Sequence, residues 1–513
     1  MTHWIIAPIV LPAILAPFII LAARYHIGIQ RVFSVAGVLA LIVISAGLAW
    51  DASDGSVKLY QLGDWASPFG IGLVADRLST AMVLLTSVLA FFVLLFVIGS
   101  GWDERGRHFH SLYQFQLMGI TGAFLTGDLF NLFVFFEILL IASYGLMIHS
   151  GGNLRLRAGV QYVLFNLLGS TLFLFALGAI YAETGTLNMA DLANRVTLID
   201  ENASVGIRIA AVLLLLVFAI KAALAPLHFW LPSSYAEAPA PVAALFAIMT
   251  KVGAYSIIRV YTMVFPTDLE VTAGLHSSWL LPAALLSLVI GTIGVLGARS
   301  LDRLVAFSVI GSMGMVMIAV SKFTEDSITA ALYYMVHSTL AAAALFLIVD
   351  LVRSGRNNLT LTLAPPIPRD ALTAALFFVA AIAMTGLPPL SGFVGKLLVL
   401  EAAFSTPYVV WTWAFVLTAS LVSVVGFARA GSVIFWKAKN TEHVEETEER
   451  SSSTALSFVA VGGLLTLLVG HTVFAGPIYD YMTATSVQLF APDDYISTVL
   501  DTPGKMSPTK EGN

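Results

Sequence analysis

The chain has 513 residues, of which 58% are hydrophobic and 11% are charged, and its mean hydropathy is +0.88. Soluble globular proteins average about 45–50% apolar and about 25% charged residues, so this composition excludes an ordinary soluble domain and indicates an integral membrane protein. The formal net charge is only −5, and the lack of cysteine excludes disulfides, thiolate zinc sites and iron–sulfur clusters held by this chain.

The first apolar stretch begins at Trp4, and no lysine or arginine occurs before Arg24. It lacks the basic region of a cleaved signal peptide, so we expect it to remain as a membrane span. Further apolar stretches of roughly 17–25 residues match a hydrocarbon core about 30 Å thick. Lipid cannot satisfy backbone polar groups, so each stretch is predicted to be a helix. About fourteen spans are predicted, at 4–22, 32–50, 77–99, 112–127, 129–149, 157–181, 207–230, 240–264, 278–298, 304–321, 326–351, 371–403, 408–436 and 454–476.

Basic residues are distributed unevenly between alternate loops, which predicts the orientation of the chain. If the N-terminus lies outside, an even number of spans also places the C-terminus outside. The outer loops then contain only Lys58, Arg77, Arg195, Arg208 and Lys322. The cytoplasmic loops contain Arg24, Arg31, Arg105, Arg107, Arg155, Arg157, Arg299, Arg303, Arg353, Arg356, Arg369, Arg429, Lys437, Lys439 and Arg450. The acidic run at 442–450 is interpreted as a solvated loop, and 477–500 as an interfacial helix against a neighbouring subunit.

Several ionisable residues remain inside the predicted spans. A lysine or a carboxylate at the centre of a membrane helix costs about 2.5–3.5 kcal/mol on insertion scales. Three central lysines together carry roughly 7–10 kcal/mol, which is comparable with the net stability of a domain. These side chains therefore need partners, water or both. They are Glu137, Lys221, His228, Lys251, His337, Lys396 and Glu401.

Each of these residues also has a purely structural interpretation. Lys221 could snorkel to the interface or form a structural ion pair, Glu137 could be structural, and His337 could be a satisfied core histidine. Glu401 lies near the end of its span, which favours a structural role. Several ionisable groups on different helices fit that interpretation poorly when they are taken together.

Proton exchange explains the set better. Burial disfavours a charged lysine and a nearby carboxylate favours it, so a lysine in a partly hydrated cavity can change protonation when a neighbour moves. Hydroxyl groups nearby, such as those of Thr250, Ser338 and Ser391, would help to hold bridging water. The predicted chain of proton-exchanging sites is Glu137, Lys221, Lys251, His337 and Lys396.

Two spans contain helix breaks close to a lysine. Pro226 and Pro232 bracket the sequence LHFW after Lys221, and TGLPPLSGFVGK places Pro388, Pro389 and Gly392 just before Lys396. Proline removes a backbone donor, which is tolerated at membrane depth only where protein or water satisfies the freed groups. Interrupted helices in corresponding positions of two halves indicate an inverted-repeat transporter with its site near the midplane.

Three stretches resemble a known family. They are KAALAPLHFWLPSSYAEAPAPVAALFAIMTKVGAY, MTGLPPLSGFVGKLLVLEA and FFEILLIASYGLM. They resemble the antiporter-like membrane subunits shared by respiratory complex I and the Mrp-type multisubunit cation/proton antiporters, over roughly residues 70 to 435. The length of the chain, the lack of a long C-terminal extension and segments such as HSTLAAAALF resemble the D-subunit branch of the Mrp antiporters most.

The resemblance implies an all-α fold of fourteen helices with two inverted five-helix repeats, each containing a broken helix. It places three N-terminal helices in 1–111, the repeats in 112–264 and 278–436, and a cytoplasmic loop, a last helix and a polar tail in 437–513. The proton path that it implies runs through Glu137, Lys221, Lys251 and Lys396. Many relatives carry a lysine shortly after the histidine of the eleventh helix, whereas alanines at 341–344 follow His337 here. Either His337 is the sole titrating group of that helix, or its role differs.

The preferred function is export of cytoplasmic Na⁺, or another monovalent cation, in exchange for external H⁺ driven by the proton-motive force. Glu137 would modulate the charge of Lys221, and a proton arriving at one site would expel charge at the next. The spans contain no cage of oxygen ligands for a dehydrated cation, so Na⁺ could cross through a partner subunit. The implied assembly is a hetero-oligomer of six or seven different membrane proteins in a bacterial inner membrane, surrounded by lipid. We expect no cofactor, no bound metal and no nucleic acid.

Two other functions stay open. The chain could be a proton-pumping subunit of a redox complex, either NADH:quinone oxidoreductase or a membrane-bound hydrogenase. It has no glycine-rich dinucleotide fingerprint after a strand, so any redox centre would belong to partners. A scaffold without transport is disfavoured, because scaffolding does not require ionisable residues at membrane depth.

Overall fold

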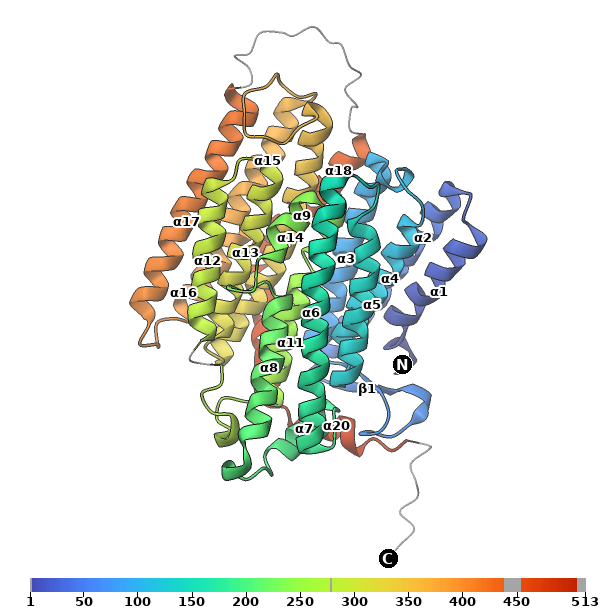
Figure 1. The fold of residues 1–513 in the computed structure, drawn as a ribbon, viewed down its shortest axis with the longest axis vertical. Coiled ribbons are helices and arrows are strands. Elements are labelled where there is room, and N and C mark those ends of the chain that lie inside the picture. The colour runs from blue at the N-terminus through green and yellow to red at the C-terminus, as the bar shows by residue number, and fades with distance from the viewer. Residues whose placement is uncertain (1, 277–278, 438–453, 505–513) are drawn as a thin grey trace, which may run out of the picture.

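The computed structural model describes residues 2–276, 279–437 and 454–504, and Figure 1 shows a bundle of helices packed side by side. The first part of the chain forms α1 (Ala7–Ala22), α2 (Ile27–Ala52), β1 (Lys58–Gln61), β2 (Gly72–Ala75), α3 (Arg77–Ser100), α4 (Phe109–Leu125), α5 (Leu129–Met147), α6 (Asn153–Thr184), α7 (Met189–Val196), α8 (Val205–Lys221), α9 (Trp230–Glu237), α10 (Ala240–Phe246) and α11 (Met249–Met263). The second part forms α12 (Leu280–Gly297), α13 (Leu301–Val320), α14 (Glu325–Arg356), α15 (Asp370–Thr385), α16 (Ser391–Glu401), α17 (Val409–Gly431), α18 (Ala455–Val473), α19 (Ala475–Phe490) and α20 (Asp493–Asp501).

The prediction of an all-α multi-pass membrane protein is confirmed. Within the described residues, ten helical segments are long and apolar enough to cross a membrane, and α1 and α15 are shorter apolar helices. Each predicted span overlaps at least one of the observed helices.

Three features differ from the predicted elements. The span predicted at 240–264 is interrupted at Ala247 and Ile248, so that α10 and α11 are separate. The loop between α2 and α3 contains a small antiparallel hairpin in which β1 pairs with β2. After α18 the chain forms α19, which packs against α14 and α11 of the same chain, so this segment is not simply a helix lying against another subunit. The acidic run at 442–450 lies outside the described residues.

The most deeply enclosed spans are α10–α11 and α14. In the most apolar window of Ala240–Met263 all residues are buried, and in that of Glu325–Arg356 94% are buried. In the window of Val409–Trp436, on the periphery, only 22% are buried. Lys251 lies on α11 and His337 on α14. Both predicted site residues therefore lie in the centre of the bundle.

The two ends of the bundle have different chemistry. At one end, here called the hairpin end, β1 and β2 lie next to both ends of the described chain, because the rings of His3 and Tyr60 meet and Gln61 Nε2 donates to Thr502 O at 3.1 Å. The opposite end is here called the arginine-rich end. There Arg31 Nε contacts Asp103 Oδ2 at 2.7 Å.

Polar contacts at the arginine-rich end join loops that are far apart in sequence. Burial alone would raise the pKa of Asp103, but hydrogen bonds from His110 and Arg31 lower it to about 2. Trp102 Nε1 donates to Asp350 Oδ2 on α14 at 2.9 Å, and the Arg105 guanidinium lies 4.2 Å from the Trp102 ring centroid. These contacts connect the loop between α3 and α4 to the end of α14.

Candidate functional site

The first helix break lies directly after Lys221, the last residue of α8. Helical structure resumes only at Trp230, and Ala223 has a φ of +53°. Protein atoms satisfy freed backbone groups here: the Ala225 amide donates to Ser287 Oγ at 2.8 Å, and Trp230 Nε1 donates to Ile220 O at 3.0 Å. The interruption is therefore stabilised by specific hydrogen bonds of the fold.

The prolines of this break have different positions. Pro226 lies in the non-helical segment, whereas Pro232 lies in the first turn of α9, where a missing amide hydrogen removes no helical hydrogen bond. His228 is buried in the non-helical segment, and its Nδ1 has no hydrogen-bond partner within the described part of the chain.

The second break separates α15 from α16. Gly386 ends α15 with a φ of +74°, Pro388 and Pro389 lie in the connection, and Ser391 is the first residue of α16. Lys396 then reaches back to the end of α15, where Nζ donates to Thr385 O at 2.6 Å. A cation at this position is favoured by the partial negative charge of a helix C-terminus.

The stem of Lys396 occupies the space that a side chain at residue 386 would need. A Cβ added to Gly386 would lie 2.6 Å from Lys396 Cδ. Lys396 Nζ also donates to Ser420 Oγ on α17 at 2.9 Å. A cavity of about 30 Å³ adjoins this lysine, enough for roughly two water molecules. Its polar lining is Thr292, Ser308, Ser312, Tyr334, Lys396, Ser420 and Ser423.

Lys221 and Glu137 are each held by α6 and form no direct ion pair in the described structure. The Lys221 side chain is buried, and Nζ donates to Asn166 Oδ1 at 3.3 Å. Ser170, one turn further along α6, donates to Glu137 Oε1 on α5. The ammonium also lies 5.7 Å from the Phe136 ring centroid. Lys221 therefore does not snorkel to the interface.

Lys251 is completely buried, and its Nζ has no hydrogen-bond partner among the described residues. Gly253 brings the helix of Lys251 close to the first break, because a Cβ at Gly253 would lie 2.5 Å from the Ala222 amide nitrogen. Thr250 donates to Ala247 O at 3.4 Å, in the interruption between α10 and α11. A buried ammonium without a partner is strongly unfavourable, so Lys251 requires either its neutral form or water.

His337 connects α14 to the second break. Its Nδ1 lies 2.9 Å from Ser391 Oγ. Gly392 allows this approach, because a Cβ there would lie 2.8 Å from His337 Nε2. The helix of His337, α14, packs against α11, which carries Lys251, and against α16, which carries Lys396. His337 therefore lies on a helix that contacts both halves of the predicted chain.

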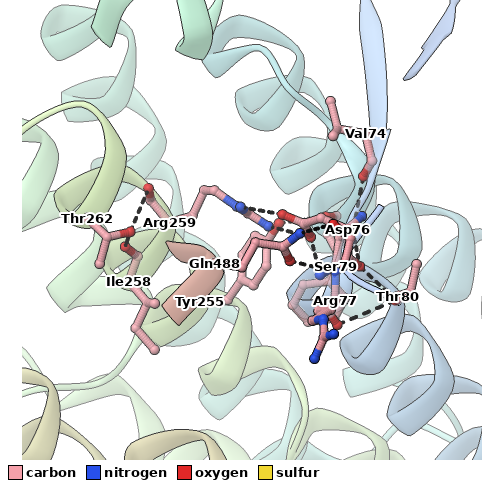
Figure 2. A network of polar contacts seen from close by, with 12 residues as sticks. Val74, Asp76, Arg77, Ser79, Thr80, Tyr255, Ile258, Arg259, Thr262 and Gln488 are labelled. Carbon is pink, nitrogen blue, oxygen red and sulfur yellow. Dashed lines mark hydrogen bonds and ion pairs between the residues drawn. The ribbon is translucent and has the colours of Figure 1, made fainter. Parts of the chain in front are cut away.

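A buried ion pair closes the hairpin end of the first half (Figure 2). Arg259 Nη1 on α11 lies 2.6 Å from Asp76 Oδ2, and both side chains are at most 5% exposed. Asp76 also accepts from the Ser79 amide at 2.8 Å as the N-cap of α3. Burial would raise the pKa of Asp76, but the charge and the hydrogen bond of Arg259 hold it below its usual value. The ring of Tyr495, on α20, lies 5.3 Å from the Arg259 guanidinium.

Comparison with known proteins identifies the family of this arrangement. The family model described as "NADH:quinone oxidoreductase/Mrp antiporter, TM" matches residues 126–423, which is more than half of the chain. The chain belongs to this antiporter family. The matched segment includes Glu137, Lys221, Lys251, His337 and Lys396.

Two curated members of the antiporter family match almost the whole chain. The D subunit of the probable K(+)/H(+) antiporter of Rhizobium meliloti (strain 1021) is 37% identical over 98% of this chain and 98% of that protein. The D subunit of the Na(+)/H(+) antiporter of Alkalihalophilus pseudofirmus is 36% identical over 98% of this chain and 100% of that protein.

Two solved structures are similar in fold to this chain. Each match covers 98% of this chain and 100% of the other chain, at 26% sequence identity. One belongs to the Mrp complex from Dietzia sp. DQ12-45-1b, with a TM-score of 0.86. The other belongs to the membrane-bound sulfane sulfur reductase, an archaeal respiratory membrane complex, with a TM-score of 0.87.

Some functional candidates of this antiporter-family chain could not be found from residue type alone. Asn166 and Ser170 are ordinary polar residues of a long helix, and only their contacts distinguish them. Arg259 did have a sequence signal, since it follows Lys251 by eight residues and both lie on one face of a helix. Of the weaker candidates, Ser338 donates, within the described residues, to Met335 O of its own helix, and Glu401 is exposed at the end of α16.

Proposed function

We propose that the chain is the D subunit of an Mrp-type multisubunit antiporter, which exchanges cytoplasmic Na⁺ or another monovalent cation for external H⁺ using the proton-motive force. The observation that carries this proposal is the match to antiporter D subunits over 98% of the chain. The buried lysines and the histidine at two helix breaks support it, because proton transfer explains the retention of such groups at membrane depth.

In this proposal, protons move along the buried residues of the central helices. Glu137 and Lys221 exchange charge through the polar side chains of α6, Lys251 and His337 carry the proton between the halves, and Lys396 exchanges it with the small cavity beside it. The proton path is lined by two hydroxyl residues and by the residues of the two helix breaks. These are Thr250, Ser391, Pro226, Pro232, Pro388, Pro389 and Gly392.

The proposed organisation follows the two breaks. Residues 1–111 form the N-terminal helices, 112–264 and 278–436 form two inverted repeats, and 437–513 form a cytoplasmic loop and the C-terminal helices. The positions of α8–α9 and α15–α16 support this division, since each pair flanks a break beside a lysine. The concentration of arginine at one end supports an orientation with both termini outside a bacterial inner membrane. The partners are the other subunits of a complex of six or seven different membrane proteins.

The test uses inverted vesicles from cells that lack their own sodium antiporters and express the full set of subunits. A pH-sensitive dye reports the collapse of ΔpH after NaCl, KCl or LiCl is added. We expect a cation response in the wild type and none in Lys221→Ala or Glu137→Ala, with assembly intact. The control is Lys58→Ala, at a partly exposed position on β1, which should respond like the wild type.

A second candidate is a proton-pumping subunit of a redox complex. The likeness to the membrane-bound sulfane sulfur reductase, with a TM-score of 0.87, favours it. Purification separates the two proposals, because a redox complex carries iron–sulfur absorbance and an antiporter complex is colourless. Absence of any cation response, together with pumping driven by NADH, hydrogen or sulfane sulfur, would replace the antiporter proposal with this one.

A further inference from the structure

His471 is a buried histidine on α18, outside the two proposed repeats. The residue is 4% exposed, and neither Nδ1 nor Nε2 has a hydrogen-bond partner among the described residues. A neutral imidazole carries one donor and one acceptor, and burying both without partners is unfavourable. An apolar ring of similar size would pack here without that penalty, so packing alone does not explain a histidine at this position.

The contacts of the C-terminal helices place His471 near mid-depth. Before α18, Thr454 Oγ1 donates to Gly99 O at 2.6 Å, close to the arginine-rich end. Near the end of α19, Gln488 Nε2 donates to Gly55 O at 2.8 Å, at the hairpin end. His471 lies 17 residues from each of these anchors, about 25 Å along a helix in either direction. It is also three residues before the break between α18 and α19 at Phe474.

The surroundings of His471 connect it to the second half of the site. Its ring packs against the Tyr333 ring with centroids 4.3 Å apart, and the Tyr333 hydroxyl donates to His471 O at 3.2 Å. The next residue, Tyr334, lies beside His337, with centroids 5.5 Å apart. Gly395, directly before Lys396, packs closely on both tyrosines.

The helices packed against α18 determine which groups can exchange a proton with His471. They include α14, which carries His337, and α16, which carries Lys396. Of the helices packed against α18, α3 has no titratable side chain after Arg77 and α15 has none after Asp370, its first residue. The short contact with α19 adds Tyr479, Asp480 and Tyr481 on that helix. In the middle of α14 and α16 the titratable groups are Tyr333, Tyr334, His337 and Lys396, and of these Tyr333 contacts the His471 ring directly.

We propose that His471 is a further proton-exchanging residue, so that α18 belongs to the translocation path of the second half. A proton arriving through water from His337 binds the free ring nitrogen and gives an imidazolium. Loss of a proton from the other nitrogen then leaves the neutral ring in its other tautomer, and no other reactant is needed. Closer to the hairpin end, α19 carries two buried hydroxyl residues, Thr485 and Ser486, and Ser486 Oγ donates to Glu325 O at 2.7 Å. The inference rests on the proposed antiport function.

The experiment uses the same vesicles with the complete complex. His471→Phe keeps an aromatic ring and removes the titrating group, and His471→Gln keeps polarity without titration near neutral pH. We expect both variants to assemble, with a Tm of the His471→Phe complex at or above that of the wild type. The initial rate of cation-induced ΔpH collapse should fall roughly tenfold or more, as for loss of a proton-transfer group.

The matched control is His276→Gln. His276 is 1% exposed and also lacks partners for both nitrogens in the described structure, but it packs between Phe323 and Tyr261 near the hairpin end. Its replacement should leave the exchange rate unchanged.

Three outcomes decide the question. Wild-type exchange in assembled His471→Phe would overturn the inference. A fall in Tm with loss of assembly in both His471 variants would assign the residue a packing role, and would overturn it as well. Failure of the proposed antiport function would give a different result from failure of this inference. In that case the wild type would show no cation response, or Lys221→Ala would keep the wild-type cation response.

Discussion

Asn166 and Ser170 lie one turn apart on α6, and each contacts a different ionisable residue on a different helix. Asn166 accepts a hydrogen bond from Lys221 on α8, and Ser170 donates one to Glu137 on α5. The carboxylate and the ammonium therefore interact across polar side chains and make no direct contact. Such an arrangement lets either group change its protonation without breaking a close ion pair.

The first prediction concerns Asn166→Leu, which removes the amide and keeps a similar volume. Hydrogen bonds to charged groups contribute about 1.5–3 kcal/mol, so we expect the rate of cation-induced ΔpH collapse to fall roughly 10- to 100-fold. Thr171→Val, at an exposed position on the same helix, is the control. An assembled Asn166→Leu complex with the wild-type rate would show that α6 does not position Lys221.

The second prediction concerns the close approach at Gly253. An added methyl group would meet the backbone of Ala222, which cannot move aside as a flexible side chain would. Overpacking of this kind costs about 1–3 kcal/mol, so Gly253→Ala should lower the Tm of the purified complex. Gly178→Ala on α6 has no atom within 4 Å of the new methyl group and should not lower it. Equal Tm values for the two variants would contradict the observed packing.

The third prediction concerns the ion pair between Asp76 and Arg259. Removing one partner of a buried pair leaves an uncompensated charge and typically costs about 3–5 kcal/mol. Asp76→Asn should therefore lower the free energy of unfolding by that order. The partly exposed pair of Lys58 and Asp51 provides the control, since Asp51→Asn should cost about 1 kcal/mol or less. Denaturation of the two variants side by side measures the difference.

The fourth prediction is a pH dependence at Asp128, the N-cap of α5. Burial raises the pKa of Asp128 to about 6, above the ordinary value of about 3.9. The folded state thus holds this proton more tightly than the unfolded state, and stability falls as the pH rises from about 4 to about 6. Above about pH 6 the loss of stability caused by ionising Asp128 no longer increases.

Asp128→Asn tests this sign, because an asparagine oxygen can still accept from the Asn131 amide. The variant should match the wild-type Tm at pH 4 and exceed it at pH 8. A variant less stable than the wild type at pH 8 would show that the ionised carboxylate stabilises the fold.

The broken helices were predictable from local sequence. Proline cannot donate a backbone hydrogen bond, so Pro226 and the pair at 388–389 indicated interruptions wherever the chain folded. The break at Ala247 and Ile248 was not predicted, because no proline or glycine marks it and the segment reads as one apolar span. At this interruption α11 packs closely against the first break, because Gly253 has no side chain to keep the backbone of Ala222 away.

Local sequence is enough to show that the chain is a multi-pass membrane protein with ionisable residues at membrane depth. Hydrophobic length and the cost of buried charge are local properties, so they can be read one segment at a time. Which of these residues lie next to one another depends on the tertiary packing of the helices. Three contacts join residues that are far apart in the sequence. Asn166 and Lys221 are 55 residues apart, Asp76 and Arg259 are 183 apart, and Tyr333 and His471 are 138 apart. Such pairs depend on how whole helices pack, and no spacing within a single helix encodes them.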